Sequence, residues 1–225
     1  MIELLCLITN EKNDKKVKNI EEKYQLPFNI TSFGNGTASS SVLNYFGLEK
    51  IKKYIYFSLI NNENKKTILK EIKKELKLNT PGNGIAFTIP LSSSTNYIKT
   101  KLNSMEVPMK EENKKEIKKE NKKEYHLIVT IITEGYSENV MNAAKKQGAN
   151  GGTLINGRSL SHQNNTKAKF LGFSIEPEKD IVLIVTESDL KNKIMEAITK
   201  IAGLKTKGGG IVFSLPISEA IGLIE

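Results

Sequence analysis

LKTKGGGIVFSLPIS, at Leu204–Ser218, repeats LNTPGNGIAFTIPLS, at Leu78–Ser92. The two stretches align over fifteen positions without a gap and share Leu, Thr, two Gly, Ile, Phe, Pro and Ser. Self-similarity at a fixed offset is the signature of a duplicated structural unit. We therefore expect two copies of one domain: a degenerate copy at residues 1–96, a charged linker at residues 97–124 and a second copy at residues 125–225.

Length and composition agree with two small globular domains. The chain has 225 residues, of which 38% are hydrophobic and 26% charged, and no apolar run is long enough to span a bilayer. The opening residues MIELLCLITN lack the basic leader and the cleavage site of a signal peptide, so we expect a strand there and a cytoplasmic protein. Cys6 is the only cysteine and lies in an apolar run, which predicts a buried structural thiol.

Charge and motifs exclude several classes of function. The net charge of +9 comes from lysines scattered among Glu and Asn, Arg158 is the only arginine, and no run interleaves aromatic with basic residues, so no nucleic-acid partner is expected. His126 and His162 have no further ligands at metal-binding spacing. The sequence has no Walker loop, Gly-x-Ser-x-Gly, CxxC or His-Glu-x-x-His. We therefore expect no enzyme, no catalytic residue, no metal and no required cofactor.

The order of elements predicts the fold. In the second half, the apolar and helical periodicities give a strand, a helix, a strand, a polar loop at Arg158–Gly172, a strand, a helix that starts at Ser188, and a strand at Gly210–Pro216. Ser137 is expected as the N-cap of the first helix and Gly148 as the left-handed residue after it. The first half follows the same order more loosely. This order predicts an α+β class with two tandem ferredoxin-like (βαββαβ) domains, each an antiparallel sheet with both helices on one face.

The stretch between the halves reads as a solvated linker. Its core, KEENKKEIKKENKKE, contains one apolar residue, Ile117, so no face of it can pack. The helix-free face of each sheet is expected to be covered by an oligomer or by the sister repeat, because its strands are apolar.

Three stretches of the second half resemble the P-II nitrogen-regulatory signalling family: GANGGTLINGRS (Gly148–Ser159), FLGFSIEPEKDIVLIVTES (Phe170–Ser188) and LKTKGGGIVFSLPISEAIGL (Leu204–Leu223). The first half resembles the family faintly, mainly in its last strand. The resemblance implies a trimeric signalling protein that is not an enzyme. It also implies binding of adenine nucleotides in clefts between neighbouring domains, and a mobile loop that contacts a regulated protein or transporter.

The resemblance also implies which residues act. A glycine-rich turn can present successive backbone amides to a phosphate. The ligand-binding residues, for ATP, ADP or AMP, are then Thr153, Arg158, Lys205, Lys207, Gly208, Gly209 and Gly210. The partner-binding loop comprises Ser159, Leu160, Ser161, His162 and Gln163.

The chain also departs from the family pattern. Typical members carry an acidic residue where this chain has Gly209, a lysine where it has Ile211 and a glutamate where it has Val182, and they have arginines in place of SEAIGLIE. The first glycine turn, PGNG, lacks lysines and looks structural. Two hypotheses follow: a ligand-binding regulator of a partner protein in nitrogen metabolism, or a trimeric scaffold on the same fold that has lost its ligand. A third, an acylphosphatase-like enzyme, lacks the arginine and asparagine it requires.

Overall fold

The computed structural model describes residues 1–26, 29–37, 51–94, 98, 100, 102, 123–158, 168–170, 173–175 and 178–223. Contacts group the chain into two compact units. Unit 1 comprises Met1–Phe33, Lys53–Tyr125 and Pro216–Glu225, and unit 2 comprises Gly34–Lys52 and His126–Leu215. The predicted domain limits stay a prediction, because most residues of the linker between them lie outside the described ranges.

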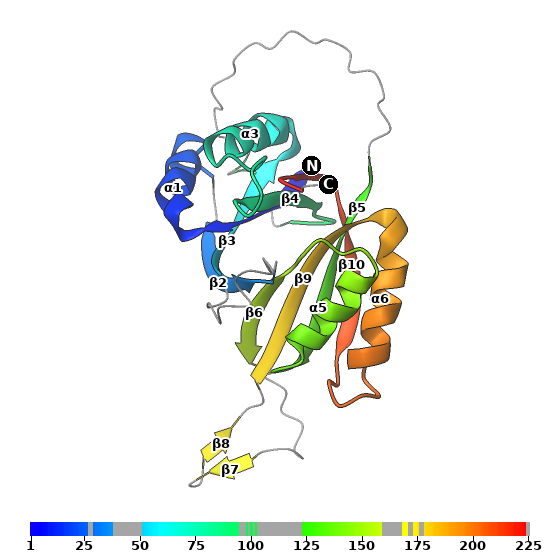
Figure 1. The fold of residues 1–225 in the computed structure, drawn as a ribbon. Helices are drawn as coiled ribbons and strands as arrows, with labels where there is room; N and C mark the ends of the chain where they lie inside the picture. The colour runs from blue at the N-terminus through cyan, green and yellow to red at the C-terminus, as the bar shows by residue number, and fades with distance from the viewer. Residues whose placement is uncertain are drawn as a thin grey trace. The chain divides into compact units, whose positions relative to one another are not determined.

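Unit 1 is an antiparallel sheet with two helices. Its elements are β1 (Ile2–Asn10), a short 3-10 helix (Glu11–Asn13), α1 (Asp14–Lys23), the first residues of β2 (Ile30–Gly36), β3 (Lys52–Asn61), α3 (Asn62–Glu75), β4 (Gly84–Pro90) and β11 (Glu219–Ile221). The strand order is β2-β3-β1-β4-β11, and β1 runs antiparallel to both β3 and β4. Both α1 and α3 lie on one face of this sheet (Figure 1).

Unit 2 repeats the arrangement. Its elements are β5 (Tyr125–Thr133), α5 (Ser137–Lys146), β6 (Thr153–Arg158), β9 (Glu178–Glu187), α6 (Ser188–Ala202) and most of β10 (Ile211–Ile217), with a separate hairpin of β7 (Ala168–Phe170) and β8 (Phe173–Ile175). The strand order is β10-β5-β9-β6, and the last residues of β2 pair with β6. Helices α5 and α6 cover one face (Figure 1).

Each unit has its own apolar core between helices and sheet. In β9, burial alternates along the strand and turns Val182 and Ile184 toward the helices. In α6, Ile194, Ile198 and Ala202 recur at helical spacing and are fully buried. The spacing of apolar residues that predicted β9 and α6 from the sequence is therefore the spacing that places these residues in the core.

The expected α+β class and βαββαβ order are confirmed. Cys6 is buried, as expected, and burial raises the pKa of its thiol. Four details differ: Tyr136 rather than Ser137 precedes α5, β7 lies within the stretch expected to be a loop, and neither β8 nor β11 has a counterpart among the expected strands. Among the described helices, none is both long and apolar enough to cross a membrane.

Candidate functional site

The glycine turn between α6 and β10 holds its own backbone amides. The Gly210 N–H donates to the Ala202 carbonyl (2.7 Å), the Gly209 N–H to the Thr206 carbonyl (3.1 Å) and the Gly208 N–H to the Thr206 hydroxyl (3.2 Å). All three predicted amide donors thus have acceptors in the turn or at the end of α6. In this conformation the turn does not present a row of unpaired glycine amides to an anion.

Thr206 organises the turn. Its N–H and its hydroxyl both donate to the Gly203 carbonyl, at 2.9 and 2.8 Å. The Gly208 carbonyl accepts a hydrogen bond from the Thr133 N–H (3.0 Å), which ties the turn to the end of β5. The turn is therefore fixed at both ends by bonds to neighbouring elements.

Packing and backbone geometry account for two of the three glycines. Gly209 has a φ of +51°, a left-handed conformation that glycine adopts without steric cost. A Cβ on Gly210 would lie 2.4 Å from the Ile132 Cγ2 atom and 2.5 Å from the Ala202 carbonyl oxygen. Gly209 and Gly210 are thus required by the turn itself, whether or not a ligand binds.

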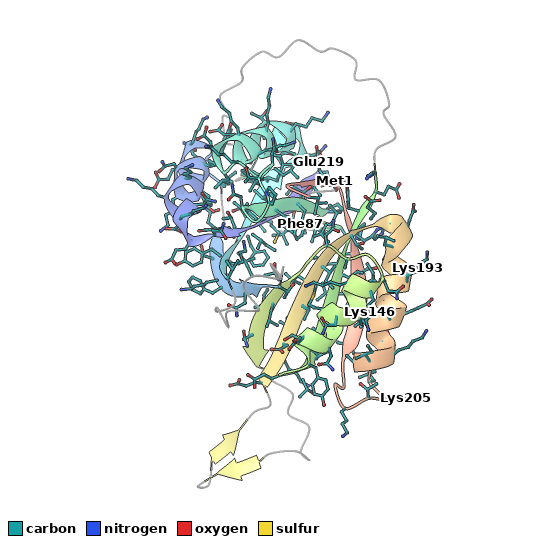
Figure 2. The ribbon with its side chains drawn as sticks, viewed as in Figure 1. Met1, Phe87, Lys146, Lys193, Lys205 and Glu219 are labelled. Carbon is teal, nitrogen blue, oxygen red and sulfur yellow. The ribbon has the colours of Figure 1, made fainter. Side chains whose placement is uncertain are left out.

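Lys205 and Lys207 supply the positive charge of the turn. Both side chains are exposed, and among the described residues neither lysine takes part in an ion pair. Figure 2 shows Lys205 at the turn that follows α6, and Lys146 and Lys193 on the two helices. The turn therefore carries two exposed ammonium groups that an anion can contact.

Strand β6 places Thr153 and Arg158 at its opposite ends. In the ladder with β9, Thr153 pairs with Leu183 and Arg158 with Glu178, a separation of roughly 17 Å along the strand. The glycine turn lies at the Arg158 end of β6. The turn is hydrogen-bonded to Thr133 at the end of β5, and the N–H of the next residue, Glu134, donates to the carbonyl of Glu178, which lies opposite Arg158 (3.4 Å). The structure therefore separates Thr153 from the turn within unit 2. The Arg158 side chain and the predicted loop, residues 159–163, lie outside what the structure describes.

Thr153 is almost fully enclosed. Its side chain is 6% exposed, and the preceding residue, Gly152, exchanges hydrogen bonds with Thr37. Lys145 also donates to the Thr37 carbonyl (3.0 Å). The surroundings of Thr153 in unit 2 are thus a packed junction rather than an open cleft.

The first glycine turn is tied down by side chains of its own unit. The Thr9 hydroxyl donates to the Asn83 carbonyl (2.6 Å), and Lys53 donates to the Gly82 carbonyl (2.9 Å). Gly222 packs so closely that a Cβ there would lie 2.5 Å from the Gly84 carbonyl oxygen. These contacts favour the structural interpretation of this turn.

A group of carboxylates near the second turn was not singled out from the sequence. The nearby carboxylate of Glu178 raises the pKa of Glu134, with smaller contributions from desolvation, a hydrogen bond to Glu178 and the charge of Asp180. Asp180 is 2% exposed and accepts a hydrogen bond from the Gly135 N–H (3.0 Å). The available signal was the acidic residues that flank strand ends in TEG and EPEKD. They make this end of unit 2 less favourable for a bare polyphosphate.

Two surface cavities lie away from the predicted residues. One, of about 300 Å³, lies between α5 and α6 and includes Lys146, Lys193 and Lys200 in its lining. The other, of about 460 Å³, lies in unit 1 beside Asn61 and Ser92–Ser94. None of the predicted ligand-binding residues lines either cavity.

Comparison with known proteins gives distant likenesses only. No protein family description and no curated protein matches the sequence. Among solved structures, PII from Arabidopsis thaliana bound to citrate is 22% identical, with 44% of this chain and 79% of that chain covered and a TM-score of 0.33. The GlnK–ATP complex of B. subtilis is 16% identical, with 44% and 90% covered and a TM-score of 0.32. An unknown protein from Galdieria sulphuraria is 13% identical, with 96% and 97% covered and a TM-score of 0.30. The fold assignment therefore rests on the strand order of the chain itself.

Proposed function

We propose that the chain is a P-II-like signal-transduction protein that binds an adenine nucleotide or a similar anionic metabolite and regulates a partner protein, in nitrogen metabolism. The observation that carries the proposal is the exposed pair Lys205 and Lys207 on a turn that internal hydrogen bonds hold rigid. A fixed turn with two flexible cations can bind phosphate or carboxylate groups through charge-assisted contacts without any catalytic group. The family-like phrases at Gly148–Ser159 and Leu204–Leu223 support the same assignment.

The acidic neighbours of the turn refine the ligand chemistry. Glu134, Glu178 and Asp180 lie at the same end of unit 2 as the turn, and like charges repel an approaching polyphosphate. A divalent cation bound to the phosphates offsets this repulsion. We therefore propose that a nucleotide binds together with magnesium, with the ion carried by the ligand.

We assign the complete site to a homo-oligomer. Thr153 and the glycine turn lie apart within one unit, and Thr153 is almost fully enclosed, so we propose that the ligand lies between the turn of one copy and strand β6 of a neighbouring copy. A trimer, as the family resemblance implies, is the assembly we propose, with residues 159–163 as the loop that contacts the regulated protein in the cytoplasm.

A second function is favoured by a specific observation. The amides of Gly208, Gly209 and Gly210 already have internal acceptors, so the glycines need no ligand to explain them. On this basis the alternative is a scaffold that has kept the fold and the loops but binds no nucleotide.

A thermal-shift titration separates the two. The purified chain is titrated with ATP, ADP, AMP and 2-oxoglutarate, each with and without magnesium. A ligand at about a hundred times its Kd adds roughly 2.7 kcal/mol, which raises the Tm by several degrees. We expect a saturable shift with one of these ligands that weakens in K205Q/K207Q.

The matched control is K146Q/K193Q, which removes the same charge from the exposed faces of α5 and α6. An equal loss of the shift in both variants would assign the effect to net charge. No shift with any ligand would favour the scaffold.

A further inference from the structure

Strand β10 is an open edge of the unit 2 sheet. It pairs with β5 on one side, and no strand of the described residues lies on its other side. Its counterpart in unit 1 is β4, which carries the same phrase: GIAFTIP in β4 and GIVFSLP at residues 210–216. Strand β4, however, lies between β1 and β11. The same edge is therefore occupied in one copy and open in the other.

The matching phenylalanines also differ in exposure. Phe87 in β4 is 1% exposed and lies opposite Ala220 of β11, whereas Phe213 in β10 is 41% exposed. Ile211, at the start of β10, is 46% exposed. An open edge with large apolar side chains is the feature that strand addition uses, because main-chain hydrogen bonds and side-chain burial are gained together.

We propose that the outer edge of β10 binds an extended segment of a partner protein as an added antiparallel strand. The register comes from unit 1, where Glu219, Ala220 and Ile221 lie opposite Thr88, Phe87 and Ala86. Shifted onto the second copy of the phrase, the same register places the added residues opposite Ser214, Phe213 and Val212. The residue opposite Phe213 must be small, as Ala220 is.

The charge of the second glycine turn indicates which residues the partner segment carries at its C-terminal end. An antiparallel strand on β10 continues past the glycine turn at its C-terminal end, as Gly222 continues past Gly84 in unit 1. The second turn carries exposed Lys205 and Lys207, whereas the corresponding positions of the first turn are Asn79 and Pro81. The partner segment therefore carries acidic residues just after its paired stretch.

Among the described strands, the one that fits this phrase is already paired. The segment that fits this phrase, Glu219–Ile221, already pairs with β4 and places Ile221 against the unit 1 core. A second molecule would have to vacate its own β4 edge to supply it. A different protein is thus the partner that could pair with β10 without breaking an existing strand pairing.

The test uses the full chain and a synthetic peptide of this sequence, Ser218–Glu225 (SEAIGLIE), as the probe. Binding is measured by fluorescence polarisation of the labelled peptide, and the site is mapped by amide chemical shifts of the isotope-labelled protein. We expect the largest shifts at Ile211–Leu215. Phe213→Ser should weaken binding by roughly tenfold or more, because the phenyl ring is buried on strand addition. The control, Ile30→Ser, removes a more exposed apolar side chain from β2 (63% against 41% for Phe213) and should leave binding unchanged.

Two peptides with single N-methyl groups separate strand pairing from general apolar adhesion. In an antiparallel ladder, successive residues point their N–H groups alternately toward and away from the partner strand. N-methylation at Ala220 or at Ile221 should therefore abolish binding in one peptide and spare it in the other.

Three outcomes would overturn the proposal. They are equal binding by the two N-methyl peptides, shifts that map to β4 in place of β10, and protection of the β10 amides by self-association in the absence of peptide. The last would assign the edge to a second copy. None depends on nucleotide binding, so failure here leaves the ligand-binding proposal standing.

Discussion

At the residue scale, the triple glycine combines two different demands on the backbone. Gly210 lacks room for a Cβ, with contacts of 2.4 and 2.5 Å to Ile132 and Ala202, while the nearest atom to a Cβ on Gly209 is 3.9 Å away. Gly210→Ala should lower the free energy of unfolding by about 2–3 kcal/mol through overpacking. Gly209→Ala, which only strains a left-handed residue, should cost about 1 kcal/mol. Chemical denaturation of both variants checks the order, and equal losses would contradict this assignment.

The buried ion pair between Glu3 and Lys65 is a second residue-scale feature. The Lys65 Nζ atom lies 2.9 Å from Glu3 Oε1, Glu3 is 2% exposed, and its Oε2 atom has no hydrogen-bond partner among the described residues. Lys65→Met leaves a buried charge unpaired and should cost about 3–5 kcal/mol. The double variant Glu3→Leu/Lys65→Met should recover most of that loss.

The exposed pair of Lys18 and Asp14 is the matched control for this cycle. Its Nζ–O distance is 2.8 Å, but the lysine side chain is 62% exposed. Lys18→Met should therefore change stability far less than Lys65→Met does. A similar loss for Lys18→Met and Lys65→Met in urea denaturation would mean that burial does not set the cost.

The candidate site could be predicted only in part at this scale. The sequence correctly located a glycine turn before β10, because Lys207–Gly210 combines breaker residues with the start of an apolar run. It could not give the acceptors of the glycine amides, because these are the Thr206 hydroxyl and two carbonyls whose direction depends on the folded turn. Nor could it show that Thr153 and the turn lie at different ends of the sheet, which follows from strand register.

At the element scale, helices α1 and α3 are joined by a carboxylate. Glu71 of α3 accepts hydrogen bonds from Lys23 and from the Tyr24 hydroxyl at the end of α1. Burial alone would raise the pKa of Glu71, but these two hydrogen bonds, together with the charges of Lys23 and Lys74, outweigh it and lower that pKa below its ordinary value of 4.5. A lowered carboxyl pKa in the folded state gives stability that is present above the unfolded pKa and is lost as the pH falls through the folded pKa.

The expected consequence is a pH dependence that Glu71→Gln removes. Between about pH 6 and about pH 3, the Tm of the unmodified chain should fall more steeply than the Tm of Glu71→Gln, because the variant has no such carboxylate to protonate. Glu75→Gln, at the exposed end of the same helix, is the control and should keep the steeper fall. Scanning calorimetry at a series of pH values measures this, and parallel curves for all three proteins would refute the role of Glu71.

Elements with strong periodicity could be predicted from the sequence, and short ones could not. The helix that begins at Ser188 was placed correctly because its apolar residues recur every three to four positions over four turns. Strand β11 has three residues, and its conformation depends on pairing with Thr88, Phe87 and Ala86, more than a hundred positions earlier. Strand β7 is equally short and, among the described strands, pairs with β8 alone. Pairing of this kind leaves no periodic signal in the sequence.

At the scale of the whole molecule, the end of the second half of the chain completes the sheet of unit 1. Deletion of residues 218–225 should therefore destabilise unit 1. It removes β11, which pairs with Ala86–Thr88, and the hydrogen bond from the Ser218 N–H to the Thr88 carbonyl (2.9 Å), and it leaves the described core of unit 2 intact. Hydrogen exchange should speed up at Ala86–Thr88 and stay unchanged at Val182–Ile184. Deletion of residues 224–225 alone keeps β11 and serves as the control. Faster exchange in unit 2 with no change in β4 would mean that the terminal segment stabilises unit 2 and not unit 1. The pairing of β11 with β4 could then no longer be used to infer the register of a strand added to β10.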